Sequence, residues 1–184
     1  WNQSFEDPTA YRIAFEQKAV DSLLTGGADL HQAIHDEHPD STSLIFKGDA
    51  FPVVAYVNRI LEPWTDPRLV KAIDLAIERR DLIQQLSQGL GKVSGPVPWV
   101  QEAWAIPQDE ITDFAAYSLD RDAALQEANE LWSAGGGPDV GPIDWVNSEA
   151  YEATRPGSTE AIAAMFNASF GTDQFRGVNQ TYGE

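Results

Sequence analysis

Apolar and polar residues follow a helical pattern most clearly between residues 66 and 89, where they predict two consecutive helices. Asp66 is a good N-cap residue, and Pro67 follows at the first helical position, where a missing N–H breaks no helical hydrogen bond. The next apolar residues recur at helical spacing and predict one buried face: Leu69, Val70, Ile73, Ala76 and Ile77. The charged run 78–81 interrupts this face. A second short helix, ended by Gly89, then has the apolar positions Leu82, Ile83 and Leu86.

The C-terminal part of the chain predicts two more helices and two strands. Asp120 is a suitable N-cap for a helix that ends at Gly135, and its apolar set is Ala123, Ala124, Ala128, Leu131 and Trp132. Residues 158–170 predict a helix with these apolar positions inside: Ile162, Ala163, Met165, Phe166 and Phe170. Apolar segments at 142–147 and 175–182 predict a strand on either side of that helix.

The N-terminal part has shorter and weaker patterns. Alternation of Tyr11, Ile13 and Phe15 predicts a strand over residues 10–15, followed by a short helix over 17–24 and an extended piece that starts at Ala28. Residues 43–46 and 51–57 predict two further strands, with a turn at 47–49. Together the alternating strands and helices predict an α/β fold, in which helices flank a mixed β-sheet.

Composition narrows the possible functions. The 184 residues carry a net charge of −17, which argues against nucleic acid or an anionic membrane as a partner, because both bind through Lys and Arg. Cysteine is absent, so disulfides and thiolate chemistry are excluded, and no apolar run has the roughly 18–20 residues needed to cross a bilayer. No nucleophile motif or phosphate-binding loop is present either. These features favour a binding protein over an enzyme, and no cofactor is expected.

Several short motifs in the stretch 53–98 follow one another in a fixed order. The first is an apolar strand that ends in Asn. It is followed by a Pro-aromatic-x-Asp turn and by a helix that begins with Arg. The remaining motifs are an Ala-Ile-acid-Arg sequence at which a second helix begins, a Gly-x-Gly loop and a Pro-x-Pro. The residues are Asn58, Pro63-Trp64-Thr65-Asp66, Arg68-Leu69-Val70-Lys71-Ala72, Ala76-Ile77-Glu78-Arg79, Gly89-Leu90-Gly91 and Pro96-Val97-Pro98. This order resembles the signature of the family 5 extracellular solute-binding proteins, the peptide and nickel receptors of ABC importers. Tyr117, Ala124 and Ala134-Gly135 extend the resemblance.

The resemblance implies a fold, a function and a location. The fold is one lobe of a periplasmic-binding-protein-like type II fold. Residues 1–52 are hinge-proximal strands with a short helix, 53–184 are a partial C-terminal lobe, and together they form one truncated domain. The function is capture of a small solute, either a dipeptide or oligopeptide or, as an alternative, an oligosaccharide, for delivery to ABC transporter permease subunits. The location is periplasmic or extracellular, with membrane contact only through the permease or a lipid anchor outside this fragment.

Four residues are candidates for ligand binding. Trp104 matches an aromatic residue of the family loop at 92–105 and can stack on a ligand, although it and Trp99 can instead pin that loop to the core. Arg155 is the nearest match to an Arg whose planar fork grips a ligand carboxylate, or it is a solvated loop residue. Tyr56 and Asn58 lie at the end of the Asn-ending strand.

The three histidines offer an alternative function. If residues 31–43 are helical, His31 and His35 share one face at a spacing of four, and His38 follows close by. Such a cluster is typical of a metal-binding protein or a metal-dependent enzyme. The bland alternative is a solvated polar loop.

Overall fold

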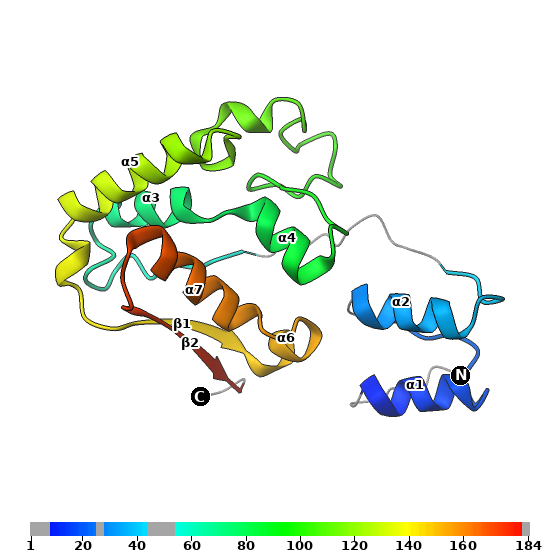
Figure 1. Ribbon diagram of the computed structural model, residues 1–184. Helices are drawn as coiled ribbons and strands as arrows, with labels where there is room; N and C mark the ends of the chain where they lie inside the picture. Colours follow the sequence, from blue (N-terminus) through cyan, green and yellow to red (C-terminus); the bar gives the residue numbers. More distant parts are fainter. Residues whose placement is uncertain (1–7, 25–27, 44–53, 182–184) are drawn as a thin grey trace. The chain divides into compact units, whose positions relative to one another are not determined.

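Helices account for most of the regular structure in the computed structural model, which describes residues 8–24, 28–43 and 54–181 (Figure 1). Its contacts divide the chain into two compact units, Trp1–Leu44 and Ile45–Glu184. No helix in the described ranges is long and apolar enough to cross a membrane.

The first unit contains two helices, α1 (Pro8–Glu16) and α2 (Ala28–Glu37). The guanidinium of Arg12 joins them, because its Nη2 donates to both carboxylate oxygens of Glu37 at 2.7 Å while its Nε donates to Glu16 at 2.7 Å. The rings of Phe15 and His38 meet edge to face, with 5.5 Å between their centroids. This ion pair and this aromatic contact link the α1 segment to the α2 segment, and Ile34 of α2 is buried in the same unit.

The predictions for this unit were wrong in three places. Residues 10–15 are helical and not a strand, since Tyr11, Ala14 and Phe15 are partly buried at helical spacing while Ile13 is 45% exposed. No helix forms in the described residues 17–24, where Lys18 has a positive φ of 57°. Ala28 begins α2 and not an extended piece.

The second unit begins its regular structure with the two predicted helices, α3 (Pro67–Ala76) and α4 (Arg79–Ser87). Asp66 caps α3 as predicted, because its Oδ1 accepts from the backbone N–H of Arg68 at 2.8 Å. Asp120 caps α5 (Arg121–Ala134) in the same way, accepting from the N–H of Ala123 at 3.1 Å. Of the predicted apolar set of α5, Ala123 is exposed, whereas Ala124, Ala128 and Trp132 are buried.

Two parallel strands and the helices between them complete this unit. The strand β1 (Ile143–Ser148) pairs with β2 (Phe175–Gln180), in a register that sets Ile143 against Phe175 and Ser148 against Gln180. The connection contains α6 (Glu149–Thr154) and α7 (Ser158–Phe170), and α7 packs against β2. The predicted helix at 158–170 is confirmed. An α/β class is therefore supported, with a purely parallel pair of strands as the sheet of the described residues.

Short turns fill the rest of the unit. The 3₁₀ turns are η1 (Ile111–Asp113), η2 (Ala115–Tyr117) and η3 (Gly137–Asp139). The predicted strands at 43–46 and 51–57 lie mostly outside the described residues, and residues 54–57, which are described, form no strand.

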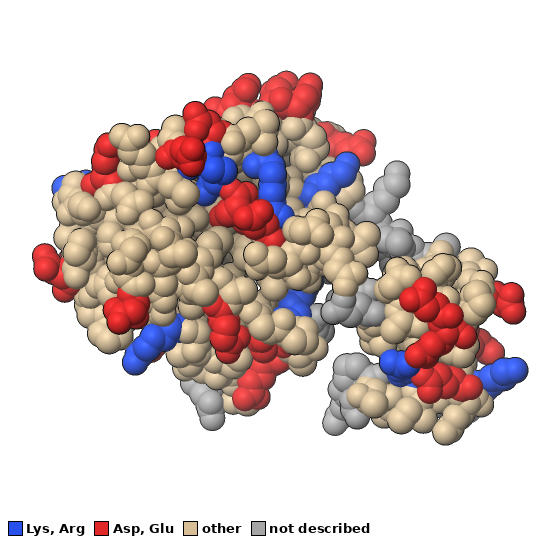
Figure 2. Space-filling view, viewed as in Figure 1, with Lys and Arg blue, Asp and Glu red and all other residues tan. Residues whose placement is uncertain are grey.

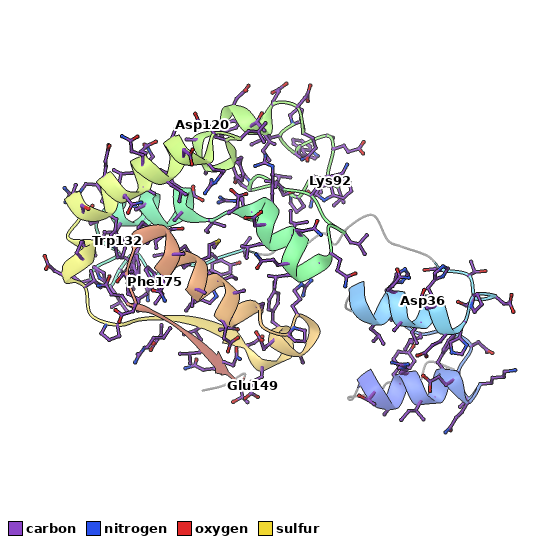
Figure 3. The ribbon with its side chains drawn as sticks, viewed as in Figure 1. Asp36, Lys92, Asp120, Trp132, Glu149 and Phe175 are labelled. Atoms are coloured by element: carbon purple, nitrogen blue, oxygen red, sulfur yellow. The ribbon has the colours of Figure 1, made fainter. Side chains whose placement is uncertain are left out.

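The core of the second unit lies between α3, α5, α7 and the inner face of the strands. Trp132, near the end of α5, and Phe175, at the start of β2, are labelled in Figure 3 and belong to this core, with 5.7 Å between their ring centroids. Phe166 is fully buried and lies 5.0 Å from Phe175 and 5.5 Å from Trp145, centroid to centroid. The backbone packs closely here, because a Cβ at Gly137 would come within 2.2 Å of the Trp132 ring. Aliphatic and small residues fill the remaining positions: Leu69, Ala72, Ile73, Leu75, Ala76, Ala128, Ile162 and Ala163.

We expect Phe166→Ala to lower the free energy of unfolding of the second unit by about 3–5 kcal/mol, because it leaves a cavity between Trp145 and Phe175. Phe114→Ala is the matched control, since Phe114 is 50% exposed and its loss should cost far less. Urea titration followed by tryptophan fluorescence measures both. Equal losses in the two variants would contradict this packing.

Candidate functional site

The four candidate ligand-binding residues lie in the second unit, with different surroundings. Tyr56 is 91% exposed and Trp104 is 81% exposed. The Asn58 side chain is used locally, because its Oδ1 accepts from the backbone N–H of Ile60 at 3.3 Å. Arg155 lies at the C-terminal end of α6, with its guanidinium 4.6 Å from the centroid of the Tyr151 ring. In the described part of the chain, no hydrogen bond, ion pair or ring contact links Tyr56, Asn58 and Trp104.

Trp99 and Trp104 lie on the same loop but have different surroundings. Trp99 is partly buried, Lys92 Nζ lies 4.6 Å above its ring, and its backbone N–H donates to Ser94 Oγ at 2.7 Å. Figure 3 labels Lys92 on this loop. Trp99 thus helps to fix the loop, whereas Trp104 offers its indole to solvent. Trp104 therefore remains a candidate for stacking on a ligand.

A groove of about 380 Å³ runs beside α3, and residues 55–59 form its other wall. Alternate residues of that segment line it, namely Ala55, Val57 and Arg59, so Tyr56 and Asn58 are not among its lining residues. From the helix side the lining is Pro67, Val70, Lys71, Ile73, Asp74 and Ile77. The groove is mostly apolar, with charged side chains among its walls.

The segment next to this groove is unusually apolar for an exposed stretch. Ile60 is 84% exposed and Leu61 is 58% exposed, in addition to Tyr56 and to Val54 at 50%. Figure 2 shows, by contrast, acidic side chains spread over the viewed face of the second unit. A gathering of large apolar side chains in one exposed segment is typical of a surface that contacts another molecule or another part of a protein.

The restart motif at residues 76–79 is structural. Glu78 caps α4, since its Oε1 accepts from the backbone N–H of Arg80 at 3.2 Å. Its Oε2 forms an ion pair with Arg121 Nε, and this contact is not a well-directed hydrogen bond. Arg79 Nη1 donates to the carbonyl oxygens of Asp74 at 3.1 Å and Ala116 at 2.8 Å. These contacts join the junction of α3 and α4 to α5 and η2.

Sequence reasoning identified Glu78 and Arg79 as family landmarks and missed what they do. The guanidinium of Arg79 also lies 4.6 Å above the Tyr117 ring, and Arg121 Nη2 donates to the carbonyl of Leu75 at 3.0 Å. The available signal was an arginine just past the end of a helix, where unpaired carbonyls accept hydrogen bonds. The distant partners could not be read from the sequence.

A second polar cluster lies near the carboxyl ends of the two strands, where α6 is followed by Arg155 and the start of α7. The carboxylate of Glu152 accepts from Ser158 Oγ at 2.9 Å, from Thr159 Oγ1 at 2.6 Å and from the Thr159 backbone N–H at 3.1 Å. It also accepts from the backbone N–H of Gly157. Burial alone would raise the pKa of Glu152, but the hydrogen bonds from Thr159, Ser158 and Gly157 outweigh it and hold the pKa below its usual range.

This cluster occupies the place where open α/β sheets bind ligands. Its donors are already used, however, because the carboxylate of Glu152 takes the N–H groups at the start of α7. Thr159 Oγ1 also lies 2.7 Å from Asn179 Oδ1 in β2, which ties the same group to the sheet. The carboxylate of Glu152 therefore stabilises the start of α7 through these hydrogen bonds.

The histidines lie in the first unit. His31 and His35 share α2 at the predicted spacing, and His31 Nε2 lies 3.4 Å from Ser43 Oγ. His38 packs its ring against Phe15, and its Nε2 is buried without a hydrogen-bond partner. Within residues 8–24, 28–43 and 54–181, no group of three or more His, Cys, Asp or Glu side chains could hold a metal ion. The described residues thus give the metal alternative no site.

Comparisons of the chain with models of known protein families and with curated proteins found no match.

We expect Glu152→Gln to destabilise the second unit by about 1 kcal/mol at pH 7, because hydrogen bonds to a charged acceptor are replaced by weaker ones. The folded-state pKa of Glu152 lies below its unfolded value, so its contribution is present above the unfolded pKa and is lost as the pH falls through the folded pKa. The difference from the original protein should therefore shrink in acid. Glu149→Gln, at an exposed position of α6, is the control for loss of a carboxylate. If the stability difference between Glu152→Gln and the original protein does not change with pH, the proposed role of the Glu152 carboxylate is wrong.

Arg79→Lys should lower the free energy of unfolding by about 1–2 kcal/mol, because one ammonium nitrogen cannot replace both Nη1, which donates to backbone carbonyls, and Nη2, which pairs with the Asp74 carboxylate. Arg176→Lys is the control, since Arg176 is exposed and its one ion-pair partner among the described residues is Asp144, at the surface. Urea titration compares the two variants. If they are equally stable, the junction does not depend on the shape of the guanidinium.

Proposed function

We propose that this chain is part of the substrate-binding component of an ABC importer, a protein that captures a small solute outside the cytoplasm and delivers it to a permease. The observation that carries the proposal is the order of elements. The signature residues become the Asp66-capped α3, the restarted α4, a Gly- and Pro-containing loop and the Asp120-capped α5. The pair β1 and β2 with α7 between them follows. This order of helices and strands supports the proposal, although the described residues 54–57 form no strand before Asn58 and residues 10–15 are helical.

The proposal includes a finer fold, in which the second unit is the larger part of one lobe of a periplasmic-binding-protein-like type II fold. Such a lobe faces a partner lobe across a cleft and closes by hinge motion. A lobe of this kind needs an open surface with exposed aromatic and apolar groups. The groove beside α3, the apolar segment at 54–61 and the exposed indole of Trp104 support this interpretation.

The ligand that we propose is a dipeptide or oligopeptide, with an oligosaccharide as the alternative. Trp104 and Tyr56 present aromatic faces, which suit either ligand. Arg155, whose guanidinium lies over the Tyr151 ring, is the cation that we propose for the carboxylate of a peptide ligand. The role is binding without chemical conversion, and the partners are the ligand and the permease subunits.

We expect the chain to bind members of a tetrapeptide pool, seen as a rise in Tm and as a saturable heat in calorimetry. Trp104→Ala should weaken that binding about three- to tenfold, through loss of a stacking contact, and should leave the Tm of the free protein unchanged because the side chain is exposed.

The control for this experiment is Leu119→Ala, a similarly exposed apolar residue at 71%. It should bind peptides as the original protein does. An oligosaccharide pool tested in parallel distinguishes the two ligand classes. The proposal would be contradicted if neither pool binds, or if the Trp104 and Leu119 variants bind peptides equally well.

A further inference from the structure

The groove between residues 55–59 and α3 has one positive charge without a partner. Arg59 lines the groove and is exposed, and it takes part in no ion pair or hydrogen bond among the described residues. The whole chain has 29 acidic residues against 12 basic ones. Among the described residues, no carboxylate occupies the Arg59 guanidinium, which is therefore available to an anion that enters the groove.

The other charged groups of the groove are neutralised within the protein. Lys71 Nζ pairs with Glu127 of α5 at 2.5 Å, and the Asp74 carboxylate pairs with Arg79. The partners in these two ion pairs, Glu127 and Arg79, do not line the groove. The uncompensated charge of the groove is therefore a single positive one.

The remaining lining is apolar and compact. Val57, Val70, Ile73 and Ile77 supply branched side chains, and Ala55 and Pro67 complete the walls. A volume of about 380 Å³ lies at the small end of the range of about 300–1,000 Å³ that is usual for ligand pockets. The groove thus suits a small ligand with a branched apolar body.

We propose that this groove binds a carboxylate attached to a compact apolar group, with the apolar group between Val57 and Val70 and the carboxylate on the Arg59 guanidinium. The guanidinium fork matches a carboxylate geometrically and can bind both of its oxygens. Two sources share this chemistry, a free branched short-chain acid and the C-terminal residue of a peptide that ends in Leu or Val. The inference needs only the groove and its charge, and it does not rest on a role in transport.

The test uses four probes that separate charge from shape and one source from the other. The free acid is 4-methylpentanoate, and 4-methylpentanamide is its neutral counterpart. The peptide is Ala-Ala-Leu with a free C-terminus, compared with the same peptide amidated. Calorimetry measures affinity, and shifts of backbone amide resonances in residues 55–59 and 67–77 locate the site.

We expect at least one carboxylate probe to bind saturably, with its amide weaker by about fivefold, the loss of an exposed charge pair. Arg59→Gln should produce the same loss, and Ala55→Phe, at an exposed position that lines the groove, should block binding by occupying the space. Lys18→Gln is the control, because it also removes an exposed cation that has no ion pair with any described residue, and Lys18 does not line the groove.

Each outcome decides the matter. Binding of the free acid alone, or of the peptide alone, supports the site and identifies the source of its ligand. The inference is overturned if neither carboxylate binds, if acid and amide bind equally, or if the Arg59 and Lys18 variants bind alike. Because a peptide pool that binds through Trp104 is a separate measurement, failure here leaves the proposed function to its own test.

Discussion

A helix leaves its last carbonyl groups without partners, and the way in which α3 meets this requirement organises the second unit. Arg79 donates to the carbonyl of Asp74, and Arg121 donates to that of Leu75. Both arginines are themselves fixed, since Arg79 lies over Tyr117 and Arg121 pairs with Glu78. One backbone requirement thereby links α3 to α4, α5 and η2, and apolar residues of α3 and α5, among them Leu69 and Trp132, belong to the shared core.

This arrangement explains why part of the family-like signature says little about a ligand. Asp66, Glu78 and Arg79 are polar, and their side chains are used on the ends of helices. A motif made of such residues specifies where one helix ends and the next begins. The same backbone turn is compatible with many different ligands. Information about the ligand must come from exposed side chains that stabilise no other part of the described structure, such as Trp104 and Arg59.

The sequence allowed a good prediction of the second unit because its signals are local. An aspartate before each of α3 and α5, and a clear apolar period through 158–170, are enough to place those helices. The first unit failed because alternation over six residues fits one face of a short helix as well as a strand, so Ile13 was assigned to the wrong side. Within the candidate site, the partners of Arg79 and Arg121 lie 37 and 46 residues away in sequence. No local pattern encodes such pairs. The positions of Tyr56 and Asn58, off the groove, depend on how one segment lies against α3, which is equally nonlocal.

Gly177 in β2 shows how closely backbone packing and charge are connected at the start of α7. A Cβ at this position would lie 3.2 Å from the backbone of Thr159, so the helix rests directly on the strand. Thr159 is also the residue that gives Glu152 two of its hydrogen bonds. A side chain at position 177 would require Thr159 to shift slightly, and this shift would act on the two hydrogen bonds that Thr159 donates to Glu152. The distance between α7 and β2 is therefore coupled to the hydrogen bonds that hold the pKa of Glu152 below its usual range.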